Sequence, residues 1–245
     1  MKILVTGGTG GLGRPTVAAL RAAGHDVRVL SRHPGPGRVV GDLSRGGGLE
    51  AAVGPVEVVV HCATNRRKDA RATRNLLDAA IAAGVEHFVF ISIVGVDDIP
   101  YFYYRDKVVI ERMIAESGIP FTILRATQFH DFIAMFFRPQ RRFPWLTVLD
   151  IEAQPIAVEE VAERLAELAV GEPSGRVADI GGPERLHLRE LAEQWQAAHG
   201  ARTKIRMLRL GGKTVRAFQA GHHMTPLPGY GTETFAEFAA RQATT

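Results

Sequence analysis

The sequence predicts an α/β protein in which helices cover both faces of a doubly wound parallel sheet, with a small lobe towards the C-terminal end. Three observations support this prediction. Short, β-rich apolar runs alternate with helical patterns as far as about residue 130. The unbroken run Val56–Val60 is typical of a central parallel strand that is buried on both faces. A chain of 245 residues suits one such unit with a small appended lobe.

The first thirteen residues, MKILVTGGTGGLG, predict a strand, a tight turn and the start of a helix. The apolar run Ile3–Val5 stops at Thr6, and a helical pattern extends from about Leu12 to Ala23. A second strand, Val27–Leu30, follows at once. A strand, a helix and a strand within about thirty residues predict a right-handed crossover that joins two parallel strands.

Three glycines in the first turn have the spacing of a dinucleotide-binding turn. Gly7 permits the sharp turn, Gly10 lets the backbone approach a diphosphate, and Gly13 lets the helix pack closely on the strand. The free N–H groups of the first helical turn, together with the helix dipole, then bind the anion. The strand before the turn and the helix after it favour this interpretation over a plain glycine-rich turn. The cofactor-binding residues predicted here are Gly7, Thr9, Gly10, Gly11, Leu12 and Gly13.

The end of the second strand predicts which cofactor is preferred. An acidic residue at this point would bind the ribose hydroxyls of NAD, but this chain has Ser31 and Arg32 instead. A guanidinium can fork onto a 2′-phosphate and stack on adenine, and Ser31 can donate a further hydrogen bond. We therefore expect NADP(H) to be preferred over NAD(H). The alternative is that Arg32 is an ordinary surface arginine beyond a strand end.

The run Val56–Val60 ends in the small residues of His61-Cys62-Ala63-Thr64. Small side chains at this strand end let the nicotinamide half of a cofactor pass, so Ala63 and Thr64 are predicted contacts. Cys62 is the only cysteine, which excludes an internal disulfide and fits a reducing compartment. We interpret it as a buried structural thiol, because no partner that would activate it can be identified.

Composition and charge exclude several classes of protein. The net charge is +4, but the basic residues are scattered and no basic run is longer than Arg66-Arg67-Lys68, so we expect no nucleic-acid partner. No apolar stretch is long enough to span a membrane, and the glycine turn interrupts any signal-peptide pattern, which predicts a cytoplasmic protein. His222-His223 has no third ligand nearby, so no metal site is expected.

A tyrosine and a lysine follow the strand predicted at His87–Ile91. Tyr103 and Lys107 are four residues apart and share a face of the helix expected there. Tyr101 and Tyr104 are competing tyrosines, and Lys107 could instead form a surface pair with Glu111.

The motif T-G-x-T-G-x-x-G, from Thr6 to Gly13, resembles the short-chain dehydrogenase/reductase superfamily in its extended and atypical branches. The segments TRNLLDAAIAAGVEHFVFIS and LRATQFHDF resemble the atypical branch that includes the NmrA-like proteins. The resemblance covers most of the chain and is most specific up to about Phe132. It implies a Rossmann-like doubly wound parallel sheet with a small C-terminal substrate lobe.

The resemblance also implies roles for particular residues. In the family, the tyrosine of Y-x-x-x-K, here Tyr103, donates a proton to a carbonyl oxygen, and the lysine, here Lys107, favours the tyrosinate and binds the nicotinamide ribose. A hydroxyl after the preceding strand helps to hold the carbonyl. That position falls on Ser92 or, in a different register, on Ile93, which would leave the triad without its serine. In the family, an Asp-Leu pair, here Asp42-Leu43 after a short strand Arg38–Val40, contacts the adenine. The alternative is that Asp42 only caps or stabilises its own turn.

The remaining chain predicts the domain organisation. Residues 1–130 are predicted to form the NAD(P)-binding domain, which regains a helix and a strand from about 156–182. Residues 131–245 are predicted to form a small substrate-binding lobe. The aromatic segment Phe129–Phe137 either belongs to a core or lines a substrate cleft. Further helices are expected at 70–83, 158–170 and 188–199, and strands at 121–124, 176–180 and 205–210. Thr234 and Glu237 predict a capping box at the last helix.

We therefore expect an NADPH-dependent oxidoreductase of the atypical short-chain type that reduces a small apolar carbonyl or quinone. The alternative is a non-catalytic, NmrA-like NADP(H) sensor that binds a protein partner. The Tyr103–Lys107 pair favours the enzyme, and the uncertain serine position favours the sensor. We expect a monomer or a homodimer.

Overall fold

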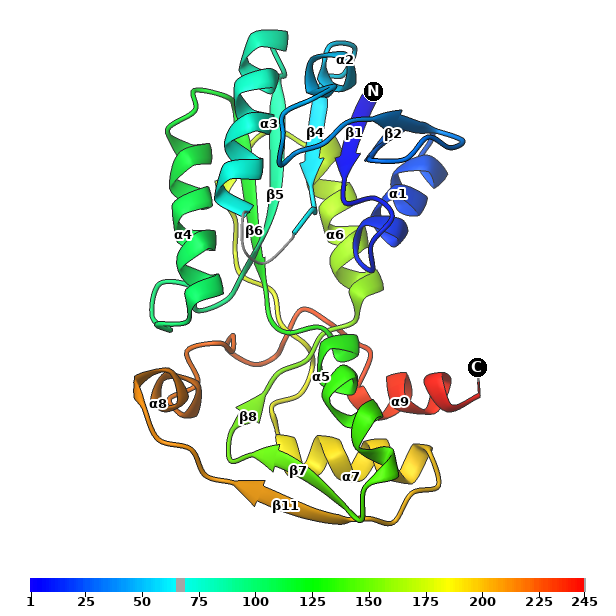
Figure 1. Ribbon diagram of the computed structural model, residues 1–245, viewed down its shortest axis with the longest axis vertical. Coiled ribbons are helices and arrows are strands. Elements are labelled where there is room, and N and C mark those ends of the chain that lie inside the picture. Colours follow the sequence, from blue (N-terminus) through cyan, green and yellow to red (C-terminus); the bar gives the residue numbers. More distant parts are fainter. Residues whose placement is uncertain (65–68, 245) are drawn as a thin grey trace. The chain divides into compact units, whose positions relative to one another are not determined.

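The computed structural model describes residues 1–64 and 69–244, which form two compact units (Figure 1). Unit 1 consists of Met1–Ser92, Phe102–Arg125 and Glu159–Ala178, and unit 2 consists of Ile93–Tyr101, Ala126–Val158 and Asp179–Thr245. The chain thus passes between the units several times. The sequence predicted one change of domain near residue 130 and a return to the first domain at about 156–182. The basic run Arg66–Lys68 lies outside the described residues.

Unit 1 is built on a seven-stranded sheet with the strand order β3-β2-β1-β4-β5-β6-β9. The strands are β1 (Lys2–Thr6), β2 (Asp26–Ser31), β3 (Arg38–Val40), β4 (Val58–His61), β5 (His87–Ile93), β6 (Phe121–Ala126) and β9 (Gly175–Arg176). The pairs β1–β2, β1–β4, β2–β3, β4–β5 and β6–β9 are parallel. From β1 the chain proceeds to β2 and β3 on one side and then returns to place β4 on the other. The order therefore reverses between β1 and β4, which confirms the doubly wound fold.

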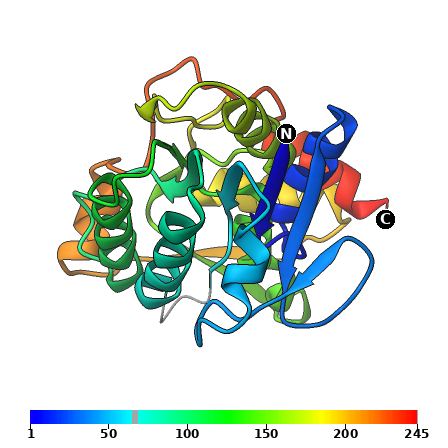
Figure 2. The ribbon, with the colours of Figure 1, turned by 90° about the horizontal axis from the view of Figure 1, so that it is seen from above.

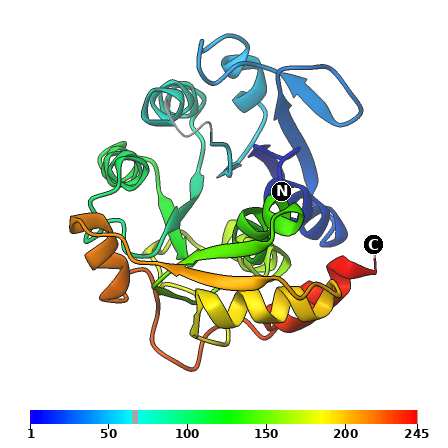
Figure 3. The same cartoon turned by 60° about the horizontal axis from the view of Figure 1, so that its bottom comes forward.

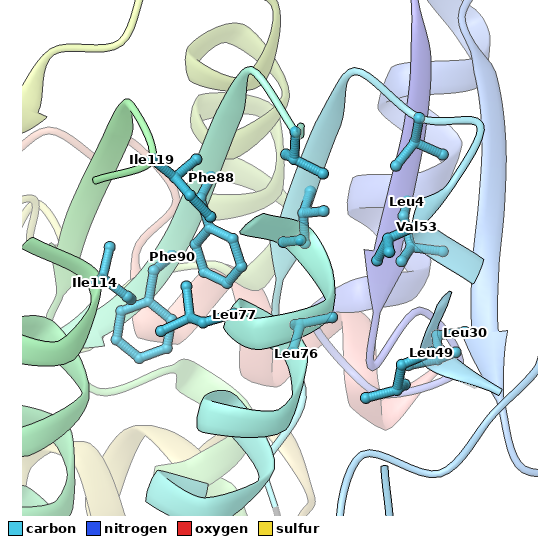
Figure 4. Packing of buried hydrophobic residues seen from close by; sticks show 14 of the residues in the cluster. Leu4, Leu30, Leu49, Val53, Leu76, Leu77, Phe88, Phe90, Ile114 and Ile119 are labelled. Carbon is cyan, nitrogen blue, oxygen red and sulfur yellow. The ribbon is translucent and has the colours of Figure 1, made fainter. Parts of the chain in front are cut away.

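Helices cover both faces of this sheet (Figures 1 and 2). The helices α2 (Leu49–Val53), α3 (Asp69–Ala83) and α4 (Phe102–Ala115) lie on one face, and α1 (Gly13–Ala22) and α6 (Val158–Val170) lie on the other. On the first face, Phe88 and Phe90 of β5 pack with Leu77 of α3 and Ile114 of α4 in one buried cluster (Figure 4). This core fixes α3 and α4 against the sheet by burial of apolar surface.

Unit 2 has a separate core. Its elements are α5 (His130–Phe137), the 3₁₀ helix η1 (Arg138–Arg142), β7 (Trp145–Leu149), β8 (Glu152–Ala153), β10 (Leu186–His187), α7 (Leu188–Ala198), β11 (Lys204–Leu208), α8 (Lys213–Gln219) and α9 (Phe235–Ala243). The strands β7 and β11 are parallel, and β8 and β10 are antiparallel. Figure 3 shows β11 beside β7, with α7 and α9 next to each other. Phe137, Trp195 and Phe235 are buried together at the centre of this core.

Most elements agree with their predicted ranges, but the strand expected at 176–180 does not. In its place the chain forms the short strand β9 (Gly175–Arg176) and one isolated bridge between Ala126 and Ile180. The ladder is interrupted where the chain leaves unit 1 after Ala178. The predicted capping box is present: the hydroxyl of Thr234 accepts a hydrogen bond from the N–H of Glu237 at the start of α9. None of the helices in the described part of the chain is long and apolar enough to cross a membrane.

Candidate cofactor and catalytic site

The turn between β1 and α1 requires glycine at two positions. Gly7 has a φ of 70°, and a Cβ atom there would lie 2.7 Å from the backbone nitrogen of Ala63. A Cβ atom on Gly13 would collide with the carbonyl oxygen of Gly7. Any side chain at Gly13 would therefore push α1 away from the turn. These are the roles that the sequence predicted for the first and third glycines of the motif.

The outer part of the turn is open. A Cβ atom on Gly10 would lie 3.2 Å from the carbonyl oxygen of Gly7, and one on Gly11 would meet no atom within 4 Å. Within residues 1–64 and 69–244, no hydrogen-bond acceptor is recorded for the N–H groups of Gly11, Leu12 and Gly13. The first turn of α1 contains no acidic residue, and Leu12 makes no side-chain cap. Open space, free donors and a positive helix end fit a bound diphosphate. Thr9 is exposed in the same turn.

The segment after β4 lies directly beside this turn. The N–H of Cys62 donates to the carbonyl oxygen of Thr6 at 3.1 Å, and the N–H of Ala63 donates to Thr6 Oγ1 at 3.4 Å. The two segments meet where the strand order reverses, between β1 and β4. Doubly wound sheets bind their ligands at this reversal, outside the carboxyl ends of the strands. The geometry thus brings the predicted contacts Gly7 and Ala63 together at the expected place.

A buried histidine connects these segments to α3. His61 Nδ1 lies 2.6 Å from Thr6 Oγ1, and His61 Nε2 lies 2.9 Å from Thr73 Oγ1. Because Thr73 donates its hydroxyl proton to the carbonyl oxygen of Asp69, His61 Nε2 must donate to Thr73. Burial, with a smaller repulsion from Lys107, lowers the pKa of His61 to about 3. The ring is therefore neutral near pH 7, and its Nδ1 accepts the hydroxyl proton of Thr6.

This histidine makes stability depend on pH. The unfolded chain takes up a proton below the ordinary pKa of 6.5, whereas folded His61 does so only near 3, so the free energy of unfolding falls as the pH drops between these values. Between about pH 7.5 and about pH 5, we expect His61 to account for a loss of about 2 kcal/mol. Urea unfolding at both values should show this loss in the wild type and in the exposed-site control His33→Gln, and not in His61→Gln. An unchanged pH dependence in His61→Gln would contradict the assignment.

Helix α4 presents Tyr103 and Lys107 near the same strand ends. Tyr103 is half-buried, and its hydroxyl lies 3.1 Å from Thr64 Oγ1, on the segment that follows β4. Lys107 is only 4% exposed, and its Nζ lies 4.7 Å from the centre of the Phe90 ring. Burial lowers the pKa of Lys107, and the carboxylate of Asp69 is the main group that opposes this shift. The Lys107 ammonium is thus shielded from solvent, and it lies 5.6 Å from the centre of the Tyr103 ring.

The contacts around α4 test two alternatives that the sequence left open: a surface pair between Lys107 and Glu111, and the competing tyrosines. Glu111 does not hold Lys107 on the surface, because its carboxylate binds Arg125 on β6, with distances of 2.9 and 2.6 Å from the two guanidinium nitrogens. Tyr104 is buried and Tyr101 is exposed. The hydroxyl of Tyr103 contacts Thr64, which follows β4.

Ser92 lies near the end of β5 and is 2% exposed. Alternation along the strand places it on the face of Phe88 and Phe90, and its hydroxyl has no recorded hydrogen-bond partner in the part of the chain that the structure describes. Ile93, the other candidate for this position, is half-buried at the last residue of β5.

The adenine end of the predicted site lies beyond β2 and β3. Arg32 is exposed, and Ser31 Oγ accepts a hydrogen bond from the N–H of His33 at 3.1 Å. Asp42 Oδ1 accepts from the N–H of Ser44 at 2.8 Å, so this carboxylate also stabilises its own turn. Leu43 packs at the edge of the core of unit 1. The roles of Ser31, Arg32, Asp42 and Leu43 towards a cofactor remain predictions.

Two residues of this site received no role from the sequence. Asp69 begins α3, one residue before the predicted start, and its side chain accepts the hydroxyl proton of Thr64 at 2.5 Å. An acidic residue before an apolar helical pattern is a start signal, and it could have indicated Asp69. His61 was part of a quoted strand end, but nothing in the local pattern connects it to Thr6 and Thr73.

Other reactive groups do not add to the site. Burial raises the pKa of Cys62 to about 12, so the thiol stays protonated and is a poor nucleophile at neutral pH. Among the described residues, no three His, Cys, Asp or Glu side chains are grouped as a metal ion would require.

The chain is similar in sequence to several known proteins. A family model described as NAD(P)H-binding matches residues 7–168. The photosystem II assembly factor Ycf39 of Cyanophora paradoxa is 27% identical over 229 residues, which cover 84% of this chain and 71% of that protein. A (4-alkanoyl-5-oxo-2,5-dihydrofuran-3-yl)methyl phosphate reductase of Streptomyces griseus subsp. griseus is 29% identical over 255 residues, which cover 99% of this chain and 87% of that protein.

Among solved structures, the NADPH complex of the NADPH-dependent quinone oxidoreductase QOR2 of Escherichia coli is similar with a TM-score of 0.85. The alignment covers 98% of this chain and 99% of that chain at 20% identity, which shows a shared fold. The residues that the family model matches, 7–168, span the positions of the glycine turn and of Tyr103 and Lys107. The chain therefore belongs to the NAD(P)H-binding family, as its resemblance to the NmrA-like, atypical short-chain dehydrogenase/reductase proteins predicted.

Proposed function

We propose that this protein is an NADPH-dependent oxidoreductase that reduces a small apolar carbonyl or quinone. One observation carries the proposal: a chain of contacts joins the glycine turn to the tyrosine of α4. The turn touches the backbone at Ala63, and the next residue, Thr64, is hydrogen-bonded to Tyr103. Lys107 lies one helical turn further along α4. The glycine turn, Thr64 and Tyr103 thus lie close together, as the proposal requires.

The chain's own residues would act as follows. The N–H groups of Gly11, Leu12 and Gly13 bind the diphosphate, and Lys107 binds the ribose of the nicotinamide. Bound NADPH supplies a hydride. The carbonyl oxygen that gains negative charge then takes the phenolic proton of Tyr103, and Lys107 stabilises the tyrosinate that remains until solvent returns a proton.

The substrate class rests on the similar proteins. The Streptomyces relative is a reductase, and the Escherichia coli protein with the same fold is a quinone oxidoreductase. A purified sample should therefore oxidise NADPH in the presence of some member of a panel of quinones, aldehydes and ketones. Failure of every acceptor, with tight NADPH binding, would contradict the enzyme. It would favour the second candidate, a non-catalytic NADP(H)-binding protein with a protein partner, which the similarity to an assembly factor supports.

Arg32 should determine the preference for NADP(H). Its guanidinium is exposed beyond β2, where a 2′-phosphate is expected. One charge-assisted contact is worth about 1.5–3 kcal/mol, so we expect roughly a tenfold to hundredfold preference for NADPH over NADH. Arg32→Glu should reverse this preference in calorimetric titrations, whereas Arg112→Glu, at an exposed arginine near the end of α4, should retain it. Equal or tighter binding of NADH by the wild type would exclude this role.

A further inference from the structure

We propose that Thr64, held by Asp69, is the hydroxyl residue that positions Tyr103, in the place of a serine at the end of β5. The catalytic consequence of this inference rests on the proposed function, whereas the contacts themselves do not. Thr64 and Asp69 are positioning residues in this account, because they act through the tyrosine.

The donor and the acceptor in each hydrogen bond of Thr64 follow from the number of protons that its partners carry. A carboxylate only accepts, so Thr64 donates its hydroxyl proton to Asp69 Oδ2 at 2.5 Å. A hydroxyl has a single proton, so Thr64 must be the acceptor in its contact of 3.1 Å with Tyr103. The phenolic proton of Tyr103 thus points towards Thr64 before a substrate arrives. The hydroxyl of Thr64 holds the phenol in one orientation on the segment that borders the glycine turn.

Asp69 is itself held in place, which makes it a firm anchor for Thr64. It is 3% exposed and is the first residue of α3, where the positive end of the helix stabilises a carboxylate. Its carbonyl oxygen accepts the hydroxyl proton of Thr73 at 2.9 Å, and Thr73 accepts in turn from His61. The anchor of Thr64 is therefore part of the hydrogen-bond chain that begins at Thr6 of β1.

Ser92 differs from Thr64 in its exposure to solvent and in its hydrogen-bond contacts. Its hydroxyl is buried without a recorded partner in the described ranges, and no contact between Ser92 and Tyr103 is recorded there. Thr64 is exposed, on the segment after β4, and it contacts Tyr103 directly. The hydroxyl that contacts Tyr103 therefore follows β4, whereas the family pattern places it after β5.

Steady-state kinetics test the catalytic consequence. Thr64→Val should lower kcat about tenfold to hundredfold through loss of one oriented hydrogen bond, while KM for NADPH changes little, and Thr64→Ser should restore kcat. Because Thr64 is exposed, the variant should fold, and circular dichroism checks this. Thr147→Val is the matched control: Thr147 lies on β7 in unit 2, and its side chain has no recorded contact within the described chain.

A double-mutant cycle should show that Thr64→Val has little further effect when Tyr103 is already phenylalanine. Additive effects would overturn the inference.

A spectroscopic measurement tests the contact without turnover. With ¹³C-labelled tyrosine, the chain gives signals from its 4 tyrosines, and Tyr103→Phe identifies the one from Tyr103. In the absence of cofactor, Thr64→Val and Asp69→Asn should move the Tyr103 ring signal, and Thr64→Ser should restore its position. A signal that moves in Ser92→Ala and stays unchanged in Thr64→Val would overturn the inference. If the expected shifts occur but no acceptor is reduced, the proposed function fails and the positioning contact stands.

Discussion

Replacement of Tyr103 by phenylalanine should lower turnover by roughly 10²–10⁴-fold while the affinity for NADPH changes little. A hydride that arrives at a carbonyl carbon leaves negative charge on the oxygen, which needs a proton or a strong hydrogen bond. Tyr103 is half-buried on α4, with the cation of Lys107 5.6 Å from the centre of its ring. Turnover follows from the loss of NADPH absorbance, and affinity from calorimetric titration.

The neighbouring residue Tyr101 provides a control for this effect. Tyr101→Phe should leave turnover near the wild-type value, because the exposed Tyr101 lacks the four-residue spacing to Lys107. Full activity of Tyr103→Phe on every accepted carbonyl and quinone would show that the tyrosine is not the proton donor. Solvent would then supply the proton, as the reduction of a quinone permits.

Substitution of Gly10 by valine should weaken NADPH binding by about a hundredfold or more without unfolding the protein. The branched side chain would occupy the open side of the turn, where a diphosphate must approach the free N–H groups. The fold should survive, because a Cβ atom on Gly10 lies 3.2 Å from its nearest neighbour, the carbonyl oxygen of Gly7. A shift of a few tenths of an ångström relieves that contact.

Two other glycines of the turn make this experiment specific. Gly11→Ala adds a methyl group where no atom lies within 4 Å, so folding should be unaffected. Gly13→Ala should destabilise the protein, because its Cβ atom would collide with the backbone of Gly7. A folded Gly10→Val protein that binds NADPH with wild-type affinity would show that the diphosphate is bound elsewhere.

Local patterns in the sequence predicted much of unit 1 because parallel strands and glycine turns leave strong local signals. The strand Arg38–Val40 and the helix Val158–Val170 have the predicted bounds. The glycine spacing also predicted the sharp turn at Gly7, where φ is 70°, and the close packing at Gly13. The sheet of β7 with β11 was not predicted, because its partners are about sixty residues apart in sequence and most residues of β11 are exposed.

The candidate site also combines features that local sequence patterns predicted with contacts that only the folded chain creates. The pair Tyr103 and Lys107 could be predicted, because a four-residue spacing on one helix is a local feature. The contact between Tyr103 and Thr64 joins α4 to the end of β4, which only the folded sheet brings together. The hydrogen bonds of His61 to Thr6 and Thr73 likewise join three elements, and no periodicity in one segment can indicate them.

A crystal structure of the protein with NADP⁺ tests the central claim most directly. We expect the diphosphate to accept hydrogen bonds from the N–H groups of Gly11, Leu12 and Gly13, at the reversal of strand order between β1 and β4. The nicotinamide ribose should contact Lys107, and the nicotinamide should lie beside the hydroxyl of Tyr103. A cofactor bound away from the glycine turn, or one whose nicotinamide lies far from Tyr103, would contradict the account.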